Sequence, residues 1–198
     1  MGFLICMDNI SFKAKIIPTY PREFAKKTIQ HGIENFVGQP WTLAESVISK
    51  NAFTKQIMDC TAIGIKNKEK TEILHLSVEN IDKFNKITEH IKSNFDLKSP
   101  DTEVILLGAK PEYTHGPESY KFFDMFVKFF TDLGTSLSIL KGGSGAKGLA
   151  HSSASNAWLV SSTDMPQISS STYISPLDVL KKMFNEVKIS EKDQVRWI

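Results

Sequence analysis

The sequence contains few cysteines, and their number excludes one class of fold. Only Cys6 and Cys60 occur among its 198 residues, whereas small secreted domains that depend on disulfides usually carry several cysteine pairs. We therefore expect two free thiols in a reducing compartment, with Cys6 in a structural role.

The sequence also lacks a strong charge of one sign and a long hydrophobic run. Its 24 basic and 22 acidic side chains leave a formal net charge of +2, which gives little attraction toward nucleic acid or an anionic membrane. No segment approaches the ~20 apolar residues that span a bilayer, and the first residues lack the basic leader of a Sec signal peptide. A soluble protein with no nucleic-acid partner is expected, and its oligomeric state is left open.

Metal-binding and nucleotide-binding motifs are absent as well. The histidines in question are His31, His90, His115 and His151. None has a ligand-like spacing to cysteines or carboxylates, so no metal site is expected. In the glycine-rich stretch 142–148, Lys147 is followed by glycine and not by the Ser or Thr of a phosphate-binding loop. We expect no cofactor, and we interpret the stretch as a mobile loop that admits a substrate or supplies backbone donors.

Helix-like and strand-like segments alternate along the chain. Apolar residues at helical spacing predict helices over 22–36, 42–48, 80–95, 119–133 and 177–187. Runs that favour β-structure predict strands over 61–65, 73–78, 102–107, 136–140 and 157–160. This order predicts an α/β fold with a mixed β-sheet flanked by helices.

The length of the chain suits one domain over residues 1–198. Within it we expect an N-terminal helical segment over 1–50, a central core over 52–162, and a C-terminal helix and tail over 176–198.

Three residues in the middle of the chain suggest a catalytic site. Cys60 opens one predicted strand, and His75 lies in the next, fifteen residues later. If the two strands are neighbours, the imidazole can act as the base of a thiol nucleophile, and an imidazolium would lower the thiol pKa. The hydroxyl of Thr54, six residues before Cys60, would accept a hydrogen bond from the imidazole and fix its orientation.

The spacing of Thr54, Cys60 and His75, with Leu76 after the histidine, resembles that of the bacterial protein glutamine deamidases. This family includes the chemoreceptor deamidase CheD, cytotoxic necrotizing factor and Burkholderia lethal factor. The segment 104–109, the helix from Ser119 and the Gly142–Gly143 pair follow in the same order as in CheD. The resemblance covers about residues 52–162 and implies a CheD-like fold with a sandwich-like core.

The resemblance also implies an activity. It implies hydrolysis of a glutamine side chain of a target protein to glutamate through a cysteine thioester, with Cys60, His75 and Thr54 as the catalytic residues and no metal or organic cofactor. A bacterial cytoplasmic enzyme is implied, or a toxin or effector delivered into a host cell. The identity of the target is left open.

One residue departs from the family pattern. The family usually has Gly or Ser before the nucleophile, whereas this chain has Asp59. A carboxylate beside a thiol raises the thiol pKa unless it points away. Two alternatives therefore stay open: a transglutaminase or protease that uses the same Cys/His pair, and a non-catalytic protein-binding module of the same fold.

Overall fold

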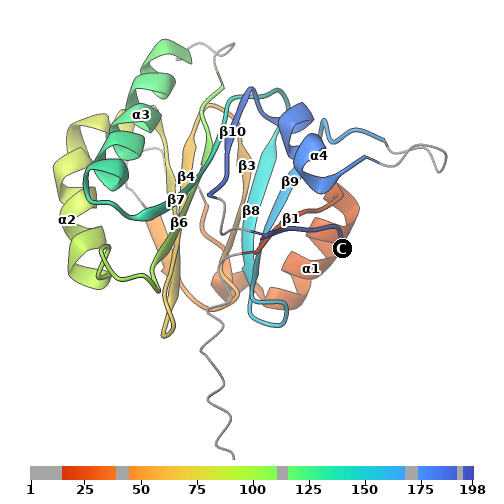
Figure 1. The fold of residues 1–198 in the computed structure, drawn as a ribbon, viewed down its shortest axis with the longest axis horizontal. Helices are drawn as coiled ribbons and strands as arrows, with labels where there is room; N and C mark the ends of the chain where they lie inside the picture. Colours follow the sequence, from red (N-terminus) through yellow and green to blue (C-terminus); the bar gives the residue numbers. More distant parts are fainter. Residues whose placement is uncertain (1–14, 39–44, 111–115, 168–173, 191–193) are drawn as a thin grey trace, which may run out of the picture.

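The protein is a mixed α/β structure built on two β-sheets. The computed structural model describes residues 15–38, 45–110, 116–167, 174–190 and 194–198. Figure 1 shows the two sheets in the middle, with α2 and α3 on one side and α1 on the other. The expected α/β class with a mixed sheet is confirmed, with two sheets in place of one.

The first sheet, which we call sheet A, joins segments from both ends of the described chain. Across the sheet its strands are β11 (Gln194–Val195), β1 (Lys15–Pro18), β9 (Ala157–Ser162), β8 (Lys147–Ser152) and β3 (Phe53–Ile57). β1 pairs in parallel with both β9 and β11, and the other pairs are antiparallel. Residues 1–50, expected to be helical, therefore also supply a strand.

The second sheet, sheet B, has six strands. Across the sheet they are β10 (Glu186–Lys188), β7 (Ser136–Lys141), β6 (Glu103–Gly108), β4 (Thr61–Lys66), β5 (Thr71–Leu76) and β2 (Glu45–Ile48). Only β6 and β7 are parallel.

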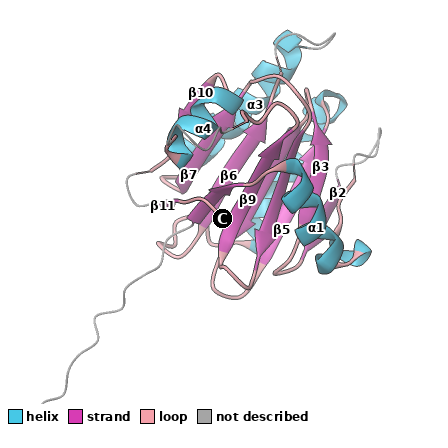
Figure 2. Cartoon of the chain, turned by 90° about the vertical axis from the view of Figure 1, so that its right-hand side faces the viewer, coloured by secondary structure: helices cyan, strands magenta, loops and turns pink. Residues whose placement is uncertain are grey.

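The helices are α1 (Pro21–His31), the 3-10 turns Ile33–Asn35 and Val78–Lys83, α2 (Phe84–Asn94), α3 (Gly116–Asp132) and α4 (Pro176–Met183). Helices α1, α2 and α3 cover the outer faces of the sheets, whereas the buried residues of α4 join the core between the sheets. Phe24 of α1 joins an apolar cluster on the outer face of sheet A, whereas α2 and α3 pack on the outer face of sheet B. Figure 2 looks toward the face that α1 covers, with the strands behind it.

The main apolar core lies between the sheets, because alternate side chains of both sheets point inward. Trp158 of β9 is 1 % exposed, and its ring lies against Gly64 of β4. A Cβ at Gly64 would come within 2.6 Å of that ring, so only glycine leaves room for it.

The helix expected over 22–36 ends at His31 and is followed by a 3-10 turn, and two other predicted helices are strands in part. The helix expected over 42–48 is strand β2 from residue 45 onward, and residues 42–44 lie outside the described residues. The helix expected over 177–187 ends at Met183, and residues 186–188 form β10 instead. In both places pairing with a neighbouring strand outweighs the local helical pattern.

Candidate active site

Cys60 lies where the chain crosses from sheet A to sheet B. β3 ends at Ile57 and β4 begins at Thr61, so residues 58–60 form the crossing. Cys60 therefore precedes the strand that it was expected to open. Its side chain is 3 % exposed and belongs to the core between the sheets.

His75 points into the same space between the sheets. In the antiparallel pair β4–β5 it lies opposite Ala62, so the expected neighbourhood of the two strands is confirmed. Cys60 is two residues before Ala62. Because side chains alternate along a strand, an extended chain places Cys60 and His75 on the same face, diagonal to one another.

Thr54 reaches His75 from the opposite sheet. Its hydroxyl and Nδ1 of His75 form a hydrogen bond of 2.7 Å between β3 and β5. Thr54 has no exposed surface and His75 is 2 % exposed. A bulge at Gln56, which has a positive φ of 60°, lets both Thr54 and Ile57 face inward. The expected orienting contact is therefore present, and it joins the two sheets.

The other imidazole nitrogen is left without a partner. Nε2 of His75 is buried and has no hydrogen bond within the described part of the chain. The thiol of Cys60 is thus not bonded to it in this conformation. It contacts Oδ1 of Asp59 instead, at 3.8 Å. The structure brings Thr54 and His75 together, and it places Cys60 on the same sheet face as His75 with no hydrogen bond between the thiol and the imidazole.

The protonation of the two groups follows from burial. Burial, then the charges of Asp59 and Glu79, raises the pKa of the Cys60 thiol to about 12. Burial lowers the pKa of His75 to about 4. At neutral pH both groups are uncharged, so the low thiol pKa expected from a neighbouring imidazolium is not found. The expected effect of Asp59 is found, because its carboxylate contacts the sulfur.

The backbone around Cys60 is fixed by residues that sequence reasoning did not single out. The Cys60 carbonyl accepts a hydrogen bond from Ala109 N–H at 3.0 Å, and Ser119 of α3 donates to the Asp59 carbonyl. Gly108, with a φ of 130°, lies so close that a Cβ there would be 2.1 Å from the Cys60 oxygen. Its signal in the sequence is a glycine that ends a buried strand.

The remaining sequence candidates lie elsewhere. Cys6 and His115 are outside the described residues. His151 lies between the sheets, and His90 is on α2. No group of three or more His, Cys, Asp or Glu side chains in the described ranges is arranged to hold a metal ion.

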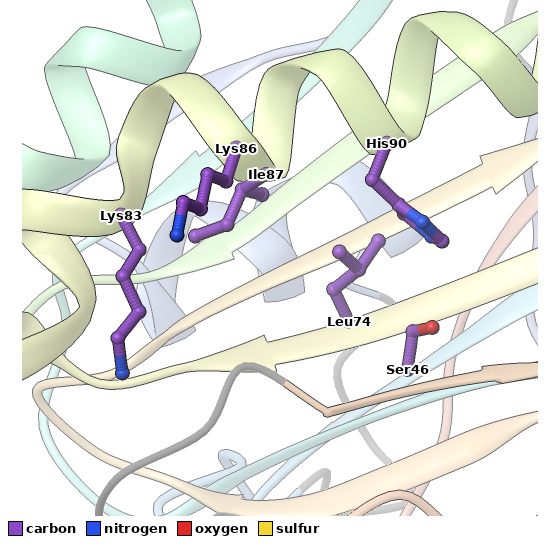
Figure 3. Close-up of a pocket in the computed structure, with 6 residues that line it drawn as sticks. All are labelled: Ser46, Leu74, Lys83, Lys86, Ile87 and His90. Carbon is purple, nitrogen blue, oxygen red and sulfur yellow. The ribbon is translucent and has the colours of Figure 1, made fainter.

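Two surface cavities lie away from Cys60. One, of about 250 Å³, lies between α2 and sheet B, on the face of the sheet opposite to Cys60 (Figure 3). It is lined by Ser46, Leu74, Lys83, Lys86, Ile87 and His90. The other, of about 260 Å³, lies beside α1, where Ile29 and Ile33 are 79 % and 81 % exposed. Neither cavity was predicted from the sequence.

No protein-family model matches the chain, and no similar sequence was found among curated proteins. None of the described helices has both the length and the apolar character needed to cross a membrane.

Proposed function

We propose that the protein is a cysteine-dependent protein-glutamine deamidase with Cys60 as nucleophile, His75 as base and Thr54 as the residue that orients the imidazole. One observation carries the proposal: the hydrogen bond of 2.7 Å between Thr54 and His75. The other ring nitrogen, Nε2, has no partner among the described residues and lies between the sheets, on the sheet face shared with Cys60. A nucleophile, a base and an orienting group are the three elements of such a site.

The reaction begins with transfer of the Cys60 proton to Nε2 of His75 as the sulfur attacks the carboxamide carbon of a glutamine side chain. For this step Nδ1–H of His75 donates to Thr54, which leaves the lone pair of Nε2 free for the proton. The C–N bond then breaks, His75 returns the proton to the departing nitrogen, and ammonia leaves. His75 then takes a proton from water as the water oxygen attacks the thioester carbon, the C–S bond breaks, and His75 returns that proton to the sulfur, which gives glutamate and the free thiol.

The resting geometry requires one local movement. The sulfur contacts Asp59, and rotation about the Cα–Cβ bond of Cys60 moves it to another staggered position. Because the thiol is neutral at rest, its proton transfers to His75 during attack and not beforehand. The enzyme is thus proposed to react slowly with small electrophiles and faster once a substrate displaces the contact with Asp59.

The proposed target is a glutamine of another protein. The enzyme acts in the bacterial cytoplasm or, as a toxin or effector, inside a host cell. A transglutaminase or a protease would use the same acyl-thioester and differ in the group that attacks or leaves.

The test compares the wild-type chain with Cys60→Ala in a whole-cell lysate, followed by peptide mass spectrometry. Deamidation predicts glutamines that gain about one dalton only with the wild-type protein, with loss of at least ~1000-fold in the variant. Amine-coupled glutamines indicate a transglutaminase, and new peptide ends indicate a protease. Identical peptide patterns with both proteins would refute all three activities.

A second candidate function is a non-catalytic protein-binding module. It is favoured by the thiol itself, which is buried, contacts a carboxylate and has a pKa raised to about 12. Alkylation by iodoacetamide separates the two functions. A binding module predicts that the rate at Cys60 does not change when His75 is replaced by Gln, whereas the deamidase predicts a slower rate without its base.

A further inference from the structure

Lys147, the first residue of β8, is a buried lysine that contacts a glycine-rich loop. Its side chain is 1 % exposed, and Nζ donates to the carbonyl oxygens of Gly143 at 3.1 Å and Gly145 at 3.3 Å. Lysine is rarely buried so completely without a carboxylate in contact. Here backbone carbonyls of the loop 142–146 solvate the amine.

The loop 142–146, between β7 and β8, also crosses from one sheet to the other, and it runs beside the crossing that carries Cys60. On sheet A, Ile57 pairs with Lys147, so the two crossings meet that sheet on neighbouring strands. On sheet B, Ala109 N–H bonds to the Cys60 carbonyl, and Gly142 N–H bonds to the Gly108 carbonyl at 2.8 Å. Cys60 and Gly142 are therefore separated by a single intervening strand, about 10 Å in backbone terms.

The lysine also determines where the loop directs its N–H groups. In a trans peptide the carbonyl and the following N–H point in opposite directions. Because the Gly143 carbonyl points to Lys147, the N–H of Ser144 points away from it. The N–H groups of Gly143, Ser144 and Gly145 make no hydrogen bond to the described part of the chain, so they are available to a ligand.

The loop conformation depends on its glycines. Gly143 has a φ of 77°, and a Cβ there would lie 1.9 Å from the Met183 carbonyl oxygen. The loop is thus pressed against the end of α4 on one side and tied to Lys147 on the other. The loop expected to be mobile is held by defined contacts.

We propose that Lys147 is a positioning residue of the proposed deamidase, which holds the loop 142–146 so that its free N–H groups bind the carboxamide oxygen of the substrate glutamine. The inference rests on the proposed function. Developing charge on that oxygen is stabilised by pre-oriented N–H donors, and a loop without its lysine loses that orientation. Burial, the largest cause, and the charge of Lys110 lower the pKa of Lys147 to about 8, whereas the charge of Asp164 opposes this shift.

The experiment measures kcat and KM on a synthetic peptide that spans the strongest Cys60-dependent glutamine from the lysate. Lys147→Met keeps the length of the side chain and removes its donors. It is expected to lower kcat about 10- to 100-fold with little change in KM. Lys147→Gln, which retains an N–H donor, should recover part of the loss. Lys141→Met is the matched control, because Lys141 lies at the other end of the loop and its Nζ bonds to Asp124.

Two further measurements separate the possible failures. Amide hydrogen exchange of residues 142–146 should be faster in Lys147→Met, whereas iodoacetamide should alkylate Cys60 at the wild-type rate. An unchanged kcat, or a loss equalled by Lys141→Met, overturns the role of Lys147 while the deamidase stands. Absence of deamidation by the wild-type chain overturns both. If Lys147→Met does not fold, Lys147→Gln is compared with Lys141→Met instead: a lower kcat in Lys147→Gln supports the role of Lys147, and an equal or higher kcat overturns it.

Discussion

Two buried histidines lie between the sheets, near opposite ends of β4, and they differ in the partner of Nδ1 and in the neighbour of the ring. His75 bonds through Nδ1 to Thr54, and His151 donates Nδ1–H to the Lys50 carbonyl at 2.6 Å. Burial, as the largest cause, lowers the pKa of both to about 4, and both have an unpartnered Nε2 within the described chain.

The second difference is the neighbour of each ring. His75 shares its sheet face with Cys60, whereas the ring of His151 packs edge-on against Trp158, with centroids 5.2 Å apart. A low pKa and an unpaired nitrogen therefore describe a buried histidine in general. Only the nearby thiol distinguishes His75 as a candidate base.

The largest expected effect comes from replacing each histidine by Gln. His75→Gln removes the proposed base and should lower deamidation about 100- to 10,000-fold, whereas His151→Gln should leave it within about threefold. Both replacements remove a buried ring, so similar losses of stability are expected. Peptide deamidation rates and urea unfolding measure the two quantities, and equal activity losses would remove the distinction between the rings.

A smaller effect is expected at Thr54. Thr54→Val keeps the shape of the side chain and removes the hydroxyl bonded to His75, so kcat should fall about 10- to 100-fold. Thr61→Val is the matched control, since the Thr61 hydroxyl is buried and has no partner among the described residues. Steady-state kinetics of both variants measure the effect. A comparable kcat in the two would show that the contact between the sheets is only structural.

A further prediction concerns the thiol that sets His75 apart. Asp59→Asn removes a charge that raises the Cys60 pKa, so alkylation by iodoacetamide at pH 8 should become about tenfold faster. Glu79→Gln should have a smaller effect, because Glu79 is a smaller cause of the same shift. Mass spectrometry of the labelled chain gives both rates, and the reverse order would contradict the contact between Asp59 and the sulfur.

The smallest difference between the two histidines is expected in acid stability. Both have a pKa lowered from 6.5 to about 4, so the unfolded chain binds more protons between these pH values. The free energy of unfolding should fall as the pH drops from 6.5 to 4, by a similar amount for each histidine. His75→Gln and His151→Gln should each flatten this fall equally in urea titrations, and a difference would show that only one ring is buried in solution.

Part of this site could be predicted from the sequence. The contact between His75 and Thr54 was predicted from spacing, and the adjacency of β4 and β5, which puts Cys60 and His75 on one sheet face, was predicted from two short β-runs and a charged turn. That Thr54 belongs to the opposite sheet could not be predicted, because β3 is short and exposes Lys55 and Gln56 at its bulge.

The remaining errors arise where strand pairing and burial outweigh the local sequence pattern. β8 was missed because Gly148 and Lys147 look like loop residues, whereas pairing with β9 and burial of the lysine keep them in a sheet. β2 carried a helix-like start and is an edge strand of sheet B. The thiol pKa depends on depth between the sheets, which no local pattern encodes.

The parallel pairing of β1 has a consequence for how the protein is made. β1 ends at Pro18, and its described neighbours, β9 and β11, begin at Ala157 and Gln194. During translation about 140 further residues are synthesised after β1 before β9, the first of these neighbours, begins. Contacts between such distant segments slow folding, so sheet A, which carries Thr54, is completed late.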